Sequence, residues 1–153
     1  MRSPLIAIIL AAGLTHCGTP PPTKSAEAAP APPKDETALF PLAAQTGTHG
    51  VANHLLGKPF LPGGTVADYK LDGTSYQLFA IRMPTGDQAA FLLLDFKKNL
   101  TNPKYLPHMG GYFGMDGAQP LYVFAKRDVV AGVAGLDQAR ADAIARVFAA
   151  RIH

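Results

Sequence analysis

Cysteine is nearly absent from this sequence of 153 residues, which has one cysteine and no tryptophan. A single cysteine can form neither an internal disulfide nor a zinc site built on several cysteines. The sequence also has little excess of one charge over the other, because it contains 14 lysines and arginines and 11 aspartates and glutamates. The formal net charge of +3 does not point to nucleic acid. The length leaves room for one folded domain.

The first 17 residues have the layout of an export signal. Arg2 precedes a largely apolar run that extends from Leu5 to Leu14. A run of about ten residues is shorter than the roughly 20 that span a bilayer, and it suits the core of a secretory signal. The run is followed by Thr15, His16, Cys17 and Gly18.

The end of this segment resembles the lipobox of bacterial lipoprotein precursors, and the resemblance covers residues 1–18 only. Leu14 and Thr15 match the family pattern before Cys17, whereas His16 replaces the small residue that the family prefers there. The resemblance implies that Cys17 is joined to a diacylglyceryl group and that the signal is removed before it. It further implies a bacterial envelope lipoprotein, and Gly18 after the cysteine implies the outer membrane. An ordinary signal peptide or an uncleaved anchor that happens to end in cysteine is the alternative.

Residues 18–37 predict a disordered tether rich in proline and alanine. They contain six prolines, and their other apolar side chains are all alanines. Such a segment cannot bury enough apolar surface to fold, and its prolines favour extended polyproline II. At about 3.1 Å per residue, the segment spans at most about 60 Å. We expect a spacer that lifts a domain off a membrane, and a PxxP ligand for a partner domain is the alternative.

We expect residues 38–153 to fold as a single α+β domain. Consecutive hairpins predict an antiparallel sheet of about five strands, with two helices packed on one face. The predicted strands cover residues 66–71, 74–83, 111–115, 121–126 and 129–133, and the predicted helices cover 86–98 and 137–152.

Local signals support these boundaries. Asp72 and Gly73 form a two-residue link of the kind that type I′ hairpin turns require. Thr85, with Gln88 three residues later, predicts a helix start, and Asp137 predicts another. The apolar run at residues 89–94 also permits a strand. We expect residues 99–110 to form a polar loop, and the pattern of residues 38–64 supports no assignment.

Five side chains are candidate ligand contacts, and no catalytic residue, metal site or cofactor is expected. The histidines do not have the spacing of a zinc site on one helix, and no carboxylate lies near the first two in sequence. Tyrosines near residues 110–125 belong to an aromatic cluster of which about half should face the core. The five candidates are His49, His54, His108, Tyr112 and Tyr122.

The composition of the folded segment favours a non-enzymatic binding or structural domain. Ser75 is its only serine and does not lie in a G-x-S-x-G elbow. Asp68 and Asp95 are the carboxylates that no turn, helix start or polar helix face explains. A small envelope hydrolase that uses aspartate and histidine is therefore the alternative. We expect a membrane and an envelope protein as partners and no nucleic acid, and the sequence leaves the oligomeric state open.

Overall fold

The computed structural model describes residues 33–153, so the predicted export signal, Cys17 and most of the predicted tether lie outside the described residues. The strands are β1 (Gln45–Asn53), β2 (Pro62–Leu71), β3 (Thr74–Arg82), β4 (Thr101–Leu106), β5 (Gly111–Asp116), β6 (Gln119–Lys126) and β7 (Val129–Ala134). The α-helices are α1 (Gly86–Asn99) and α2 (Gln138–Arg151), and two single-turn 3₁₀ helices are η1 (Thr37–Leu39) and η2 (Leu55–Gly57).

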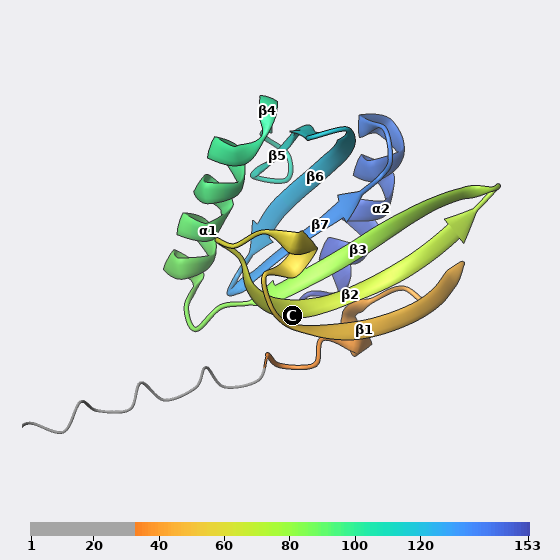
Figure 1. The fold of residues 1–153 in the computed structure, drawn as a ribbon, viewed down its shortest axis with the longest axis horizontal. Coiled ribbons are helices and arrows are strands. Elements are labelled where there is room, and N and C mark those ends of the chain that lie inside the picture. The colour runs from red at the N-terminus through yellow and green to blue at the C-terminus, as the bar shows by residue number, and fades with distance from the viewer. Residues whose placement is uncertain (1–32) are drawn as a thin grey trace, which may run out of the picture. The chain divides into compact units, whose positions relative to one another are not determined.

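The described residues form one seven-stranded sheet with the strand order β1-β2-β3-β7-β6-β5-β4 (Figure 1). Every neighbouring pair of strands is antiparallel. Helix α1 connects β3 at the centre to β4 at one edge, and the chain then returns strand by strand until β7 pairs with β3. The α+β class and the antiparallel sheet are confirmed, with seven strands in place of about five.

The two additional strands are the two edges of the sheet. β1 lies in the segment for which the sequence supported no assignment, and β4 lies in residues 99–110, where we expected a loop. Most of their side chains are exposed on both faces, so neither strand shows the apolar alternation that identifies a half-buried strand. β4 also contains Pro103, which sheets tolerate mainly at edges.

The two α-helices pack on opposite faces of the sheet, so the expectation that both cover one face is wrong. The ring of Phe96 in α1 stacks on Phe79 of β3, with 5.7 Å between centroids. On the other face, the ring of Phe148 in α2 contacts Phe40 and Phe124 at centroid distances of 5.1 and 6.3 Å. Figure 1 shows α1 in front of the strands and α2 behind them.

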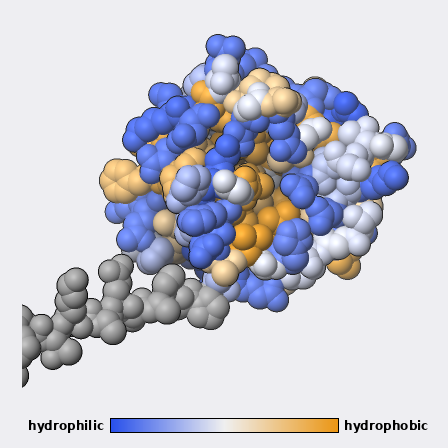
Figure 2. Space-filling view, in the orientation of Figure 1, coloured by the Kyte–Doolittle hydropathy of each residue, from blue (hydrophilic) through white to orange (hydrophobic). Residues whose placement is uncertain are grey.

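The central strands explain this arrangement. All six residues of β7 are buried, and β3 carries buried apolar side chains on both faces at Leu78 and Phe79. A sheet that is apolar on both faces needs a cover on each side. The face that Figure 2 shows is largely polar, with one apolar recess near its centre.

The predicted turn and helix starts are confirmed. Asp72 and Gly73 both have positive φ, at 49° and 79°, as a type I′ turn requires. The Thr85 hydroxyl accepts a hydrogen bond from the Gln88 amide at 3.2 Å. The Asp137 carboxylate caps α2 in the same way, and the apolar run at residues 89–94 is helical.

Gly132 in β7 allows a close contact at the sheet centre. A Cβ placed there would lie 2.5 Å from the Phe79 ring and 2.5 Å from the Tyr122 carbonyl oxygen. These atoms belong to the two strands that flank β7, so neither can move without disturbing the sheet. The absence of a side chain at this position lets the Phe79 ring lie across β7.

We predict that Gly132→Ala lowers the free energy of unfolding by about 1–3 kcal/mol, because a methyl group overpacks this contact. Chemical denaturation measures the change. Gly47→Ala is the matched control, since no atom lies within 4 Å of a Cβ at that position. Its effect should stay within about 0.5 kcal/mol. Equal effects of the two substitutions would contradict the packing described.

Candidate functional site

An apolar groove runs between α2 and the end of the β2–β3 hairpin. It consists of two adjoining hollows of about 210 and 340 Å³. Both are lined by Leu71 and Tyr76 on the hairpin and by Ala143 and Ile144 on α2. The groove exists because α2 packs against the central strands β6 and β7, while the hairpin continues beyond the helix.

Two stacked tyrosines form the floor of the groove. The rings of Tyr69 and Tyr76 lie 5.1 Å apart between centroids and are inclined by 14°. The Tyr69 hydroxyl donates a hydrogen bond to the Pro41 carbonyl oxygen at 2.6 Å, and burial raises the pKa of Tyr69 to about 12. Both rings therefore present neutral aromatic carbon to the groove at physiological pH.

Exposed apolar side chains stand around this floor. Val147 of α2 is 56% exposed and Leu71 is 50% exposed, and both line the groove. Leu42 is 80% exposed, in the segment whose neighbours Pro41 and Ala43 form another wall. Apolar side chains gathered at a hollow mark an interaction site more often than apolar side chains scattered singly. The arrangement suits an apolar segment of a partner.

Two of the three predicted histidines remain apart. His49 of β1 lies on the exposed sheet surface, with its Nδ1 3.6 Å from an oxygen of Asp68, beyond hydrogen-bond reach. The other oxygen of Asp68 accepts a hydrogen bond from Gln77 at 2.8 Å. His54 precedes η2 with a φ of 54° and is exposed. Asp68 lines a polar hollow of about 420 Å³ together with Ser75 and Gln119, but His49 is not part of its lining, so the structure does not join the pair in one cleft.

The structure brings His108 and Tyr122 together at Asp142. The Tyr122 hydroxyl donates to the Asp142 carboxylate at 2.6 Å, and the His108 ring and the Arg146 guanidinium contact the same carboxylate. Tyr122 has no exposed surface, so its hydroxyl serves this cluster. Burial raises the pKa of Asp142, but the hydrogen bonds outweigh it and hold the pKa at about 2. The cluster joins the β4–β5 loop to α2.

Tyr112 lies on the other face of the sheet, with α1. Its ring is 5.5 Å from the ring of Tyr105, and the Lys97 ammonium group lies 5.5 Å from its centroid. Asp95, the second unexplained carboxylate, pairs with Lys98 on the exposed surface of α1. The structure therefore does not bring Tyr112 and Tyr122, or Asp68 and Asp95, into one site.

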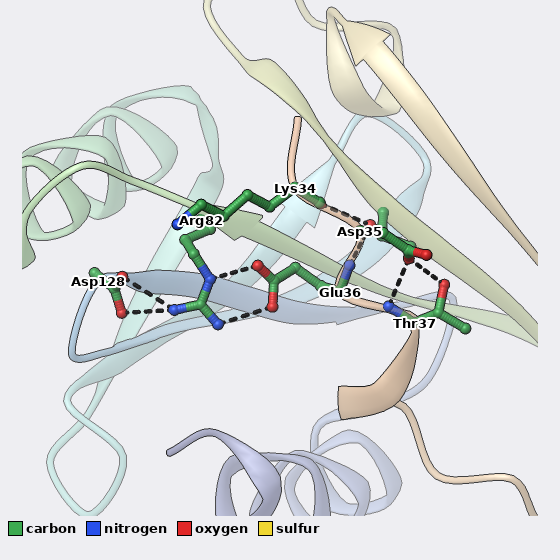
Figure 3. A network of polar contacts seen from close by, with 7 residues as sticks. Lys34, Asp35, Glu36, Thr37, Arg82 and Asp128 are labelled. Carbon is green, nitrogen blue, oxygen red and sulfur yellow. Dashed lines mark hydrogen bonds and ion pairs between the residues drawn. The ribbon is translucent and has the colours of Figure 1, made fainter. Parts of the chain in front are cut away.

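The most buried polar cluster holds the start of the described chain against the sheet (Figure 3). Glu36 is only 6% exposed, and its carboxylate accepts two hydrogen bonds from the Arg82 guanidinium. Arg82 also donates to both oxygens of Asp128 at 3.0 Å. The hydrogen bonds to Glu36 raise the pKa of Arg82, so the guanidinium in this cluster stays charged. Packed contacts thus begin before residue 38.

Sequence reasoning identified neither the groove nor this cluster. The sequence does place Tyr76 and Leu78 on one face of a strand, but the extent to which α2 covers that face depends on tertiary packing. Glu36 lies among prolines and polar residues, and only its partner Arg82, at the end of an apolar strand, signals a buried ion pair.

Within residues 33–153, no three histidines, cysteines or carboxylates come close enough to hold a metal ion. The helices of the same range are too short or too polar to cross a membrane. No protein-family model, curated protein or solved structure matches the chain.

We predict that the Asp142 cluster stabilises the fold above pH 4 and loses this effect in acid. The folded-state pKa of Asp142 lies below its ordinary value of 3.8, so the contribution disappears as pH falls from about 4 towards 2. Asp142→Asn should lower the free energy of unfolding by about 1–2 kcal/mol at neutral pH. The difference in the free energy of unfolding between Asp142→Asn and the wild type should become smaller in acid.

Denaturant unfolding at several pH values measures this difference. Asp95→Asn is the control, because its carboxylate is exposed and paired with Lys98 only. The free energy of unfolding of this control should stay within about 0.5 kcal/mol of the wild-type value at every pH. A difference for Asp142→Asn that stays constant between neutral pH and about pH 2 would refute the linkage.

Proposed function

We propose that this chain is a bacterial envelope lipoprotein, anchored through lipidated Cys17, whose folded domain is a non-enzymatic binding module. The tether spaces the domain from the membrane, which is the outer membrane by the identity of Gly18. The groove between α2 and the β2–β3 hairpin receives apolar side chains of an envelope protein. The observation that carries the binding role is the exposure of Leu71 and Val147 beside a stacked tyrosine floor.

Support for the anchor comes from the sequence. The only cysteine follows an apolar run of about ten residues and precedes a segment rich in proline. A single acyl chain binds a membrane marginally, whereas the two or three chains of a lipoprotein terminus bind it firmly.

The hydrolase alternative has less support. The pair of His49 and Asp68 is open to solvent, with 53% and 41% of the side chains exposed, and its atoms lie beyond hydrogen-bond reach. The pair of His108 and Asp142 is joined to Tyr122 and Arg146 by hydrogen bonds that hold a loop to a helix. A general base needs to reach a substrate proton, yet His49 and His108 line neither the groove nor the polar hollow beside Asp68.

We predict that the protein incorporates labelled palmitate in bacteria and loses residues 1–16. Cys17→Ser should incorporate no label and keep the export signal, because the acylated thiol is required before cleavage in lipoproteins. His16→Ala is the matched control: it introduces the small residue that the family prefers and should retain the label. Palmitate in Cys17→Ser, or none in the wild type, would exclude the anchor.

We predict that a fluorescent apolar probe of the anilinonaphthalene type binds the groove. Val147→Asp should weaken binding roughly tenfold, or about 1.4 kcal/mol, because a carboxylate opposes an apolar ligand. Phe91→Asp is the control, since Phe91 is 66% exposed on α1 and lies outside the groove. A fluorescence titration measures both variants, and equal losses would place the probe elsewhere.

A further inference from the structure

The two edges of the sheet differ in their protection against strand pairing. β4 carries Pro103 and Lys104, and its register with β5 is irregular between Thr101 and Lys104. Proline, lysine and irregular register are devices that blunt a sheet edge. β1 is nine residues long, its register with β2 shifts only near its start, between Gln45 and Gly47, and it contains no proline, aspartate, glutamate, lysine or arginine. β1 is therefore the edge at which another strand can be added.

The pairing of β1 with β2 reveals which backbone groups face outward. The His54 amide donates inward to the Leu61 carbonyl at 3.0 Å, and Asn53 stands opposite Pro62, which has no amide hydrogen. Because inward and outward residues alternate in an antiparallel ladder, the odd-numbered residues of β1 direct their amide and carbonyl groups outward. Beyond the register shift between Gln45 and Gly47, these residues are Gly47, His49, Val51 and Asn53.

Within residues 33–153, these outward groups have no backbone partner. β1 pairs with β2 alone, and none of the hydrogen bonds of the described loops and turns involves Gly47, His49 or Val51. An edge of this kind recruits a further strand through its main chain.

We propose that β1 pairs with β1 of a second copy of this chain, antiparallel and across a two-fold axis at Gly50. In this register Gly47 lies opposite Asn53 of the second copy, and His49 lies opposite Val51 of the second copy. Every outward amide and carbonyl group of the four odd residues then finds a partner. The two seven-stranded sheets become one continuous sheet.

Charge and space favour a second copy in this register. No like charges meet, since residues 45–53 carry no acidic or basic side chain other than His49, which faces valine. At the axis the two strands approach closely, and a Cβ at Gly50 would have no atom of its own chain within 4 Å. The β1 edge of one copy is thus compatible with the β1 edge of a second copy.

The expected association is weak in solution. A pairing limited to two strands buries less than the roughly 1,600 Å² of a standard interface. Copies anchored in one membrane would pair more completely, because confinement raises their effective concentration. This last point rests on the proposed anchor, whereas the pairing itself does not.

A disulfide across the axis tests the proposal directly. In the full chain with Cys17→Ser, Gly50→Cys introduces the only thiol. Opposed residues at a non-hydrogen-bonded pair have Cα atoms about 4.5 Å apart, within the range of about 4.4–6.8 Å that disulfides span. Mild oxidation of the purified protein, titrated up to about 1 mM, should give a covalent dimer as the main product.

Gly47→Cys in the same background is the matched control. It lies on the same strand, also with no atom within 4 Å of a Cβ. In the proposed register the two copies of residue 47 are six positions apart along the strands, or about 20 Å, and cannot form a disulfide. Adding Thr48→Lys to Gly50→Cys should reduce the covalent dimer at least severalfold, because a lysine at each edge opposes pairing.

The outcomes separate the possibilities. Preferential cross-linking at Gly50, lowered by Thr48→Lys, supports the dimer. Equal cross-linking of both cysteines, or none at Gly50, overturns it, and the edge would then be left to a strand of a different protein. Because the tested chain lacks Cys17, these results are independent of the lipid anchor. A result that overturns the dimer therefore leaves the proposed lipid anchor and the groove untested, and they can be judged separately.

Discussion

The structure depends on one constraint, which is that the centre of the sheet is apolar on both faces. β7 is buried along its whole length between β3 and β6. Burial of apolar surface contributes about 25 cal/mol per Å², so both faces of these strands must be removed from water. The chain meets the constraint with one helix on each face. α1 also carries the chain from β3 to the far edge of the sheet.

The same constraint determines what is left exposed. Two helices of 14 residues each cover the central strands but cannot cover seven strands. Behind the sheet, the hairpin beyond α2 leaves the groove with its tyrosine floor. At one side, β1 leaves a sheet edge. The polar clusters at Arg82 and Asp142, by contrast, fasten the first described residues and a loop to this core.

The sequence predicted the features that depend on neighbouring residues. The turn at Asp72, the cap at Thr85, both helices and five strands depend on local patterns and lie close to their predicted bounds. The remaining features depend on distant contacts. β1 and β4 are exposed on both faces and lack alternation. The face that each helix covers depends on how the chain crosses the sheet. The groove results from where α2 lies relative to a hairpin that ends more than fifty residues earlier in the chain.

Hydrogen exchange of backbone amides tests the central constraint most directly. If the centre is sealed on both faces, the amides of β3, β6 and β7 exchange slowest, with protection near the global free energy of unfolding. The outward amides of β1 in a dilute monomer should exchange orders of magnitude faster. Exchange in β3 and β7 that is as fast as in the outward amides of β1 would contradict the account.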